Sequence, residues 1–160
     1  MATGGIAQSR LAAERKQWRK DHPHGFYARP AKREDGSSNM LVWDCGIPGK
    51  VNTSWEGGRY TLTLKFTEDF PSAPPEVSFQ PPIFHPNVYP SGRVCLSILD
   101  PSKGWKPSIT LKQMLVGIQD LLDNPNNDDP AQSLASELLR KDPAQYKRRI
   151  ERQARKYRAT

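Results

Sequence analysis

Between residues 60 and 66 the chain reads YTLTLKF. Tyr60, Leu62, Leu64 and Phe66 alternate here with two threonines and a lysine. Such alternation, with a period of two residues, is typical of a β-strand that lies with one face on a hydrophobic core. This stretch therefore predicts a half-buried strand, around which the rest of the fold is arranged.

Shorter stretches with strand character lie on both sides of this strand. They cover residues 26–29, 39–47 and 76–79, and turns that contain glycine or proline, such as Asp35-Gly36, separate them. Short turns join strands that are antiparallel neighbours in a sheet. We therefore predict a four-stranded antiparallel meander.

Helical periodicity precedes and follows the predicted sheet. Residues 7–22 carry a thin apolar stripe beside a basic face, which predicts a surface helix that ends before Pro23. Residues 111–122 carry apolar side chains at helical spacing over a broad face, which predicts a largely buried helix. Two more helices are predicted at 131–140 and 143–158.

The order of these elements is a helix, four strands, a long loop and further helices. This order predicts an α+β fold in which the 111–122 helix backs the sheet. A length of 160 residues fits a single domain over 1–160. The mean hydropathy of -0.75 is low, but four Trp, five Tyr and five Phe argue against disorder.

No apolar run approaches the roughly 18 residues that a membrane span needs. The first ten residues also lack the apolar region of a secretory signal. We therefore expect a soluble, intracellular chain with no membrane partner.

The net charge of +7 is unevenly distributed. Residues 1–33 carry eight Lys and Arg against two acids, and residues 140–160 carry nine against two, whereas residues 34–139 carry seven against thirteen. Basic ends of this kind suit a nucleic acid or an acidic protein partner, or they are simply solvated helix faces. Composition leaves these three interpretations open.

Two cysteines and three histidines limit the chemistry. Two cysteines are too few for a disulfide scaffold, and no pair of Cys or His shows the spacing of a structural zinc site. We therefore expect neither a metal nor a cofactor. Cys45 shares a strand face with Leu41 and Trp43, which favours a structural role for its thiol.

The segment 80–109 has no convincing periodicity, and a long ordered loop in a small domain is usually functional. Residues 85–99 read HPNVYPSGRVCLSIL around a single cysteine, Cys95. One interpretation makes Cys95 a nucleophile, with the Asn87 amide as a donor to an oxyanion. The other is a proline-stiffened turn whose polar side chains only satisfy backbone groups, and spacing alone leaves both open.

The same segment resembles the active-site signature of the ubiquitin-conjugating enzyme family. The resemblance rests on His85-Pro86-Asn87, on the CLSIL run that starts at Cys95, and on the Trp-x-Pro that starts at Trp105. The FPSAPP run at residues 70–75 is similar to the proline-rich turn of that family. The resemblance covers nearly the whole chain and includes the order of its elements.

Within this family, the chain resembles the branch that carries the ubiquitin-like modifier SUMO. The features concerned are the basic first helix that ends in WRKDHP at residues 18–23, a longer loop around 31–38, YPSG at 89–92 and DPA at 129–131. Five residues also separate Leu99 from Trp105, two more than in the common ubiquitin carriers.

The resemblance implies roles for residues around Cys95, which would hold the modifier as a thioester. Asn87 would stabilise the tetrahedral oxyanion or hold the loop that does so. Tyr89 and Asp129 would flank the incoming lysine, and Asp129 is also a candidate N-cap of the 131–140 helix. His85 would lie in a structural turn and transfer no proton.

Further positions would bind the substrate motif, namely Ser91, Arg93, Pro130 and Ala131. Better-known family members carry basic residues where this chain has Glu76 and Ser78, and a small hydroxyl residue where it has Arg93. Either the positive charge has moved within one groove, or the selectivity for the substrate motif differs.

The resemblance also assigns the basic first helix to protein partners. Arg15, Lys16, Arg19 and His22 would bind SUMO non-covalently and meet its activating enzyme. The other implied partners are SUMO ligases and lysine-bearing substrates, with a monomeric enzyme in the nucleus and cytoplasm and no direct nucleic-acid contact.

Two alternatives remain, a ubiquitin carrier of the same fold and a basic nucleic-acid-binding adaptor. The basic segment 140–160 has no assigned role.

Overall fold

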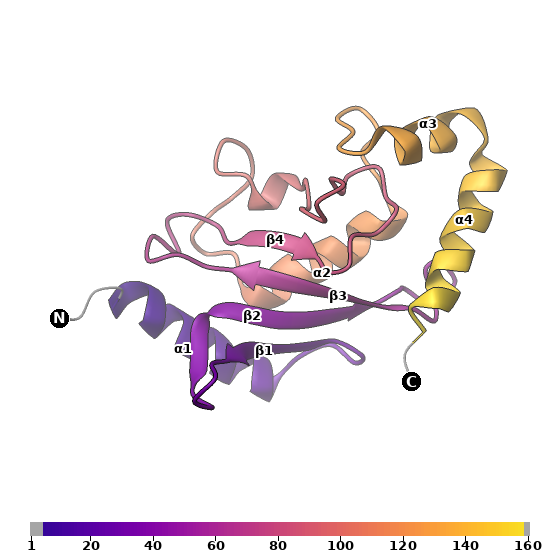
Figure 1. The fold of residues 1–160 in the computed structure, drawn as a ribbon. Coiled ribbons are helices and arrows are strands. Elements are labelled where there is room, and N and C mark those ends of the chain that lie inside the picture. The colour runs from indigo at the N-terminus through magenta and orange to yellow at the C-terminus, as the bar shows by residue number, and fades with distance from the viewer. Residues whose placement is uncertain (1–4, 159–160) are drawn as a thin grey trace.

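The computed structural model describes residues 5–158, which form four helices, four strands and one 3-10 turn. In chain order the elements are α1 (Gly5–Lys20), β1 (Tyr27–Lys32), β2 (Ser38–Pro48), β3 (Arg59–Lys65), β4 (Glu76–Phe79), η1 (Ser97–Leu99), α2 (Leu111–Asp123), α3 (Ser133–Lys141) and α4 (Pro143–Lys156). This is the predicted order, with η1 as the one regular turn inside the long loop (Figure 1).

The strands form one antiparallel sheet in the order β1-β2-β3-β4, so the predicted meander is confirmed. The alternation in β3 is also confirmed, because Tyr60, Leu62 and Leu64 are buried while Thr61 is exposed. β1 runs beyond the predicted 26–29, with an irregular register between Pro30 and Ala31.

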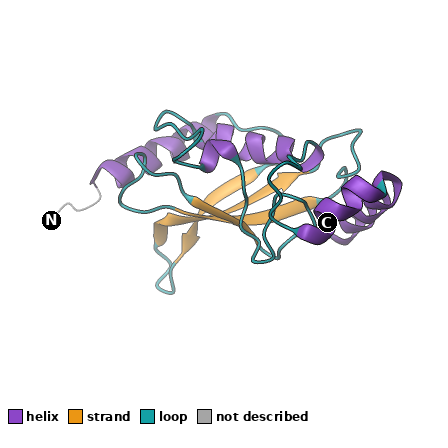
Figure 2. Cartoon of the chain, turned by 90° about the horizontal axis from the view of Figure 1, so that it is seen from above, coloured by secondary structure: helices purple, strands orange, loops and turns teal. Residues whose placement is uncertain are grey.

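Helices α1 and α2 lie on the same side of the sheet (Figure 2). On α2 the side chains of Met114, Leu115 and Ile118 are completely buried, and this face packs toward β2. The predicted backing of the sheet by this helix is therefore confirmed. Helices α3 and α4 pack against each other at one end of the sheet (Figure 1).

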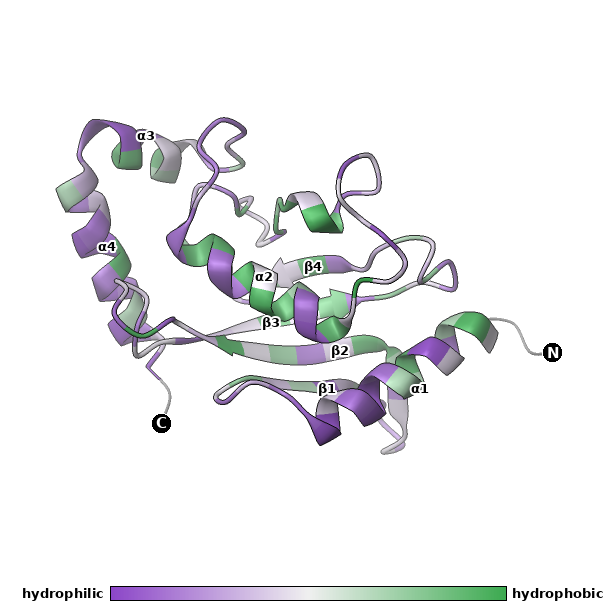
Figure 3. Cartoon of the chain, turned by 180° about the vertical axis from the view of Figure 1, so that it is seen from behind, coloured by the Kyte–Doolittle hydropathy of each residue, from purple (hydrophilic) through white to green (hydrophobic). Residues whose placement is uncertain are grey.

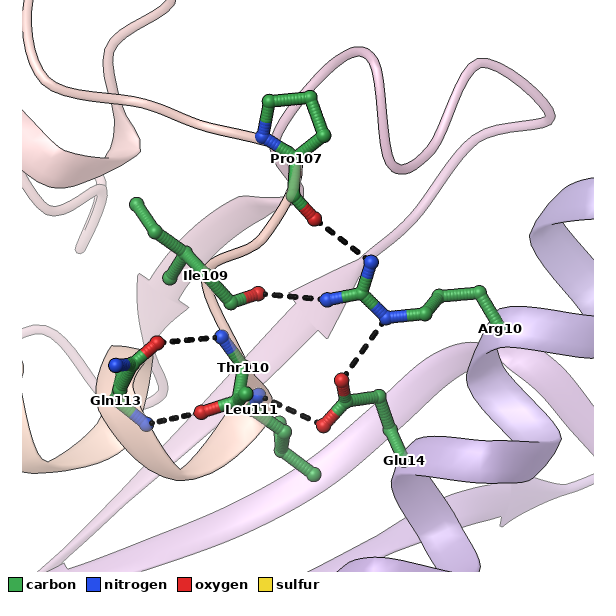
Figure 4. A network of polar contacts seen from close by, with 7 residues as sticks. All are labelled: Arg10, Glu14, Pro107, Ile109, Thr110, Leu111 and Gln113. Carbon is green, nitrogen blue, oxygen red and sulfur yellow. Dashed lines mark hydrogen bonds and ion pairs between the residues drawn. The ribbon is translucent and has the colours of Figure 1, made fainter.

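Polar contacts join α1 to the beginning of α2 (Figure 4). The Arg10 guanidinium donates to the carbonyls of Pro107, at 2.7 Å, and Ile109, at 3.0 Å, and pairs with Glu14 at 2.9 Å. The second Glu14 carboxylate oxygen accepts from the Leu111 amide at 3.1 Å. Because these side chains are partly buried, the network fixes α1 on the segment that leads from the long loop into α2.

The N-terminal caps of the helices show that the prediction for the start of α3 was wrong. Thr110 and Gln113 form a capping box on α2, and Asp142 caps α4. Helix α3 begins at Ser133 after Gln132, not at 131, so Asp129 is not its N-cap. Within residues 5–158 no helix is long and apolar enough to cross a membrane.

Candidate active site

Cys95 lies beside Asn87 because the intervening chain doubles back. Val88 and Val94 form an antiparallel bridge, and the Cys95 amide donates to the Asn87 carbonyl at 2.8 Å. Gly92 makes this turn possible: its φ is +98°, and a Cβ there would lie 2.2 Å from the Phe79 carbonyl oxygen. The turn thus sets the thiol against the segment that carries Asn87.

Cys95 lines a cavity of about 590 Å³ and is itself partly exposed. Polar and charged side chains converge on the cavity from three parts of the chain. They are Asn87, Tyr89 and Arg93 from the turn, Ser97, Asp100 and Lys103 from the following loop, and Asp120, Asn124, Asn126 and Asp129 from α2 and the segment after it. The cavity therefore has an accessible thiol and charged groups of both signs.

The Asn87 side chain is buried and holds the segment after α2. Its amide nitrogen donates to the Asn126 carbonyl at 2.7 Å and to the Asp129 carbonyl at 3.3 Å. Its amide oxygen accepts from the Asn126 backbone nitrogen at 2.8 Å. Both amide protons are already hydrogen-bonded. In this conformation the Asn87 side chain therefore anchors the loop after α2, which is one of its two predicted roles.

Asp129 presents its carboxylate to the cavity from that loop. The Lys103 ammonium lies 3.4 Å from one carboxylate oxygen, and both side chains are more than half exposed. A hydrogen bond and the charge of Asp129 raise the pKa of Lys103. A cation therefore already occupies the position beside Asp129 that the resemblance assigns to a substrate lysine.

His85 is fully buried and structural, as expected. One ring nitrogen lies 2.8 Å from the Leu121 carbonyl and 3.1 Å from that of Leu122, and the other accepts from the Asn87 amide. The ring is thus neutral and ties the Cys95 segment to the end of α2. Desolvation lowers its pKa to about 4.

This buried ring predicts a loss of stability in acid. The unfolded chain protonates His85 near pH 6.5, but the folded chain does so only near pH 4. The contribution of the neutral His85 ring to the free energy of unfolding is therefore complete above pH 6.5. It falls by about 3 kcal/mol as the pH drops to 4. Chemical denaturation across this range measures the slope. His85→Gln should lose this part of the slope, and an unchanged slope would contradict the assignment.

The two cysteines have opposite environments. Cys45 is completely buried in β2, and burial raises the pKa of its thiol. Cys95 is partly exposed in the cavity. A thiolate is the reactive form of cysteine, so these environments favour Cys95 as the nucleophile.

Of the four predicted substrate-motif residues, Arg93 alone lines the cavity, while Ser91, Pro130 and Ala131 do not. Arg93 forms an exposed ion pair with Glu76 at 3.5 Å, while Ser91 is exposed in the turn. Pro130 is also exposed, and the Ala131 amide donates to the Pro86 carbonyl at 2.7 Å. Glu76 therefore pairs with the positive charge that this chain carries beside its cysteine.

Comparison with known proteins identifies the family. The family model described as "Ubiquitin-conjugating enzyme" matches residues 10–154. The chain belongs to the ubiquitin-conjugating enzyme family.

Relatives of high identity in this family come from distant organisms. The chain is 57% identical to a Caenorhabditis elegans protein named "SUMO-conjugating enzyme UBC9" over 97% of this chain and 93% of the relative. It is 58% identical to an Arabidopsis thaliana protein named "SUMO-conjugating enzyme SCE1" over 96% of both chains. A Dictyostelium discoideum protein named "Sumo-conjugating enzyme ubc9" is 56% identical, again over 96% of both.

This member of the ubiquitin-conjugating enzyme family presents basic side chains on α1, away from the cavity. Lys16 and Arg19 are exposed, Arg15 is half-buried, and none of the three lines the Cys95 cavity. His22 lies just beyond the helix, not within it as predicted. Its ring stacks on Trp18 with 5.2 Å between centroids, and its Nδ1 is 2.9 Å from the Trp18 carbonyl oxygen.

Two residues of the site were not singled out from the sequence. Lys103 lies in the loop between Leu99 and Trp105, of which only the length was noted, and Asn126 lies just after the helix predicted at 111–122. The unusual length of the loop after Leu99 was a signal for Lys103. No local pattern pairs Asn126 with Asn87, which lies 39 residues earlier in the chain.

Proposed function

We propose that this protein is a SUMO-conjugating enzyme that carries SUMO as a thioester on Cys95 and transfers it to substrate lysines. The observation that carries this proposal is the accessible Cys95 in a cavity that it shares with Asn87 and Asp129. The names of three relatives aligned over nearly their full lengths support SUMO as the modifier. Lysine-bearing substrates are the partners that this transfer requires. SUMO ligases are further partners in the proposal, and the enzyme acts as a monomer.

Two acyl transfers make up the reaction. In the first, the Cys95 thiolate attacks the thioester carbonyl that links SUMO to its activating enzyme. A new C–S bond forms, the old one breaks, and the activating enzyme leaves as a thiolate. In the second, a neutral lysine amine attacks the Cys95 thioester, the tetrahedral intermediate collapses, and Cys95 leaves while the amine loses a proton.

The second step needs help because a lysine amine, with an ordinary pKa of about 10.4, is almost wholly protonated at neutral pH. Asp129 can accept a hydrogen bond from the amine and orient it. The Lys103 ammonium must first move away from this carboxylate. Because their ion pair is exposed and therefore weak, a substrate amine can replace Lys103 beside Asp129. The Tyr89 ring, which is 45% exposed, forms an apolar wall of the same cavity. Desolvation against this wall favours the neutral amine.

A charging reaction tests the proposed function. The protein is incubated with ATP, SUMO and the SUMO-activating enzyme, and in parallel with ubiquitin and its activating enzyme. We expect a thiol-sensitive adduct on a non-reducing gel only with SUMO. Charging with ubiquitin alone would identify a ubiquitin carrier, and strong salt-dependent DNA binding without any adduct would identify a nucleic-acid adaptor.

Asp129→Ala should leave charging nearly intact, because this carboxylate meets the amine and not the thioester. Discharge of the preformed thioester to a lysine should slow by about 10- to 100-fold at neutral pH. The deficit should shrink at high pH, where the amine loses its proton unaided. Single-turnover discharge measured across pH checks this result.

Lys103→Met is the matched control for the Asp129 variant, since it removes the same ion pair and leaves the carboxylate in place. It should discharge at least as fast as the wild type. An equal loss in both variants at every pH would mean that the ion pair only holds the loop.

Arg15→Glu combined with Arg19→Glu should slow charging by about three- to tenfold at low salt and weaken non-covalent SUMO binding. The two basic side chains would attract the activating enzyme and SUMO, and their reversal creates repulsion. Initial charging rates and titration with SUMO measure the two effects.

Two controls accompany the charge reversal on α1. Discharge to free lysine should stay unchanged, because neither residue lines the Cys95 cavity. Arg148→Glu with Arg155→Glu makes the same charge change on exposed positions of α4 and should charge normally. Normal charging by the α1 variant at low salt would reject the assigned interface.

A further inference from the structure

A second hollow of about 530 Å³ lies between α4 and the segment that follows β4. We call it the α4 groove. Its lining comprises Pro82, Ile83, Phe84 and Pro90 from that segment, Gln132 and Leu134 from the start of α3, and Arg149, Arg152, Gln153, Lys156 and Tyr157 from the end of the chain. The groove accounts for part of the basic segment 140–160, to which the conjugation reaction assigns no role.

Hydrogen bonds and stacking shape the groove. The Gln153 side chain accepts from the Phe84 amide at 2.8 Å and donates to the Phe84 carbonyl at 3.2 Å. The Arg149 guanidinium lies over the Phe84 ring, 4.0 Å from its centroid. On the other side, the Gln132 side chain donates to the carbonyls of Ile83 and Val88. The groove is therefore preformed, with the Arg149 cation already oriented on an aromatic ring.

The lining has positive charge and exposed apolar surface but no carboxylate. Arg149, Arg152 and Lys156 are all exposed, and within residues 5–158 none of them forms an ion pair. Leu134 is 70% exposed at the same site. Figure 3 shows α4 as a mostly hydrophilic helix, so its apolar partners in the groove come from other elements. Charge complementarity points to a segment with several carboxylates and one apolar side chain.

The α4 groove adjoins the Cys95 cavity. Tyr89 lines the cavity and its neighbour Pro90 lines the groove. In a second part of the chain, Asp129 lines the cavity and Gln132, three residues later, lines the groove. A polypeptide that places a lysine beside Asp129 can therefore continue over this boundary into the groove.

From this geometry we propose that the α4 groove binds an acidic-apolar segment of the substrate, in the same chain as the acceptor lysine. This inference rests on the proposed function and adds a substrate class to it. Binding in the groove raises the local concentration of the lysine at Cys95. The groove contacts stabilise the bound substrate and the transition state of transfer equally. They therefore lower KM and leave kcat unchanged.

The test compares two sets of peptides that share one acceptor lysine and carry either a Glu-Glu-Leu-Glu segment or a Gln-Gln-Ser-Gln segment. A spacer of graded length joins the segment to the lysine, on its N-terminal or its C-terminal side. Discharge of the preformed SUMO thioester to these peptides is measured in single turnover. We expect the acidic-apolar peptide of suitable spacer length to show the lower half-saturating concentration. Arg152→Glu with Lys156→Glu should raise that value by about tenfold without changing the maximal rate.

The control is Arg148→Glu with Arg155→Glu, which makes the same charge change on the same helix with neither residue in the groove. It should behave as the wild type, and discharge to free lysine should be equal in all three proteins. Equal effects of both double variants, or no preference for the acidic-apolar peptide at any spacer length, would overturn the proposal.

Fluorescence anisotropy with the uncharged protein separates this proposal from the proposed function, because it needs no thioester. The labelled acidic-apolar peptide should bind more weakly to the groove variant than to its control. If a single-stranded DNA oligonucleotide shows this difference while the peptide does not, the groove is a nucleic-acid site and the proposal is wrong.

Discussion

Cys95→Ala should form no thioester with SUMO under conditions in which the wild-type protein is fully charged. The substitution removes the sulfur that takes the acyl group, and Cys45 cannot replace it. Cys45 is completely buried in β2, and burial raises the pKa of its thiol, which keeps it in the unreactive protonated form. A non-reducing gel, with a thiol-treated lane beside each sample, measures the adduct directly.

Cys45→Ala is the matched control, since it removes the other thiol. It should charge at the wild-type rate and lose about 1 kcal/mol of unfolding free energy, because a buried side chain becomes smaller. Chemical denaturation measures that loss. A folded Cys45→Ala protein that no longer forms the adduct would reverse the assignment of the two cysteines.

Strong periodicity explains which parts of the fold the sequence predicts well. The alternation at 60–66 and the helical pattern at 111–122 match β3 and α2 within one residue at each end. In both elements the buried face is determined by side chains within the element, so local spacing carries the information.

The start of α3 was less predictable because distant contacts determine it. The amides of Ala131 and Gln132 donate to the Pro86 carbonyl, 45 and 46 residues earlier in the chain, at 2.7 and 3.2 Å. These bonds hold 131–132 outside the helix, and α3 begins at Ser133. The same contacts leave Asp129 free of a capping role and available to the cavity.

In the candidate site, too, local motifs could be predicted from the sequence, whereas contacts between distant residues could not. Cys95 and Asn87 stand in a short motif, so the sequence points to both. The Lys103 pairing with Asp129 and the Arg93 pairing with Glu76 join residues 26 and 17 positions apart, and only the folded loops bring them together. The Arg93 pairing matters for recognition of the substrate motif beside Cys95, because Glu76 already compensates the charge that an acidic substrate residue would meet.

Asn87→Ala should give the largest loss among variants that keep Cys95. It removes the donors to the Asn126 and Asp129 carbonyls and the acceptor for the Asn126 amide, all at a buried site. The loop that carries Asp129 then loses its anchor, and any donation to the oxyanion is lost as well. We expect discharge to lysine to slow by about 10²- to 10³-fold, as for loss of an oxyanion donor, with a smaller effect on charging. Single-turnover discharge of the isolated thioester measures it.

A double-variant cycle with Asp129→Ala separates the two roles of Asn87. If Asn87 acts by holding the loop, the Asp129 carboxylate is already misplaced in Asn87→Ala. Removing that carboxylate as well then adds little, and the double variant discharges about as slowly as Asn87→Ala alone. If Asn87 donates to the oxyanion directly, the two losses multiply. The engaged amide protons in this structure favour the first result, because an oxyanion would have to displace a carbonyl from Asn87 to receive its hydrogen bond. Fully multiplicative losses would contradict the positioning role and require the Asn87 side chain to turn from the loop to the oxyanion during transfer.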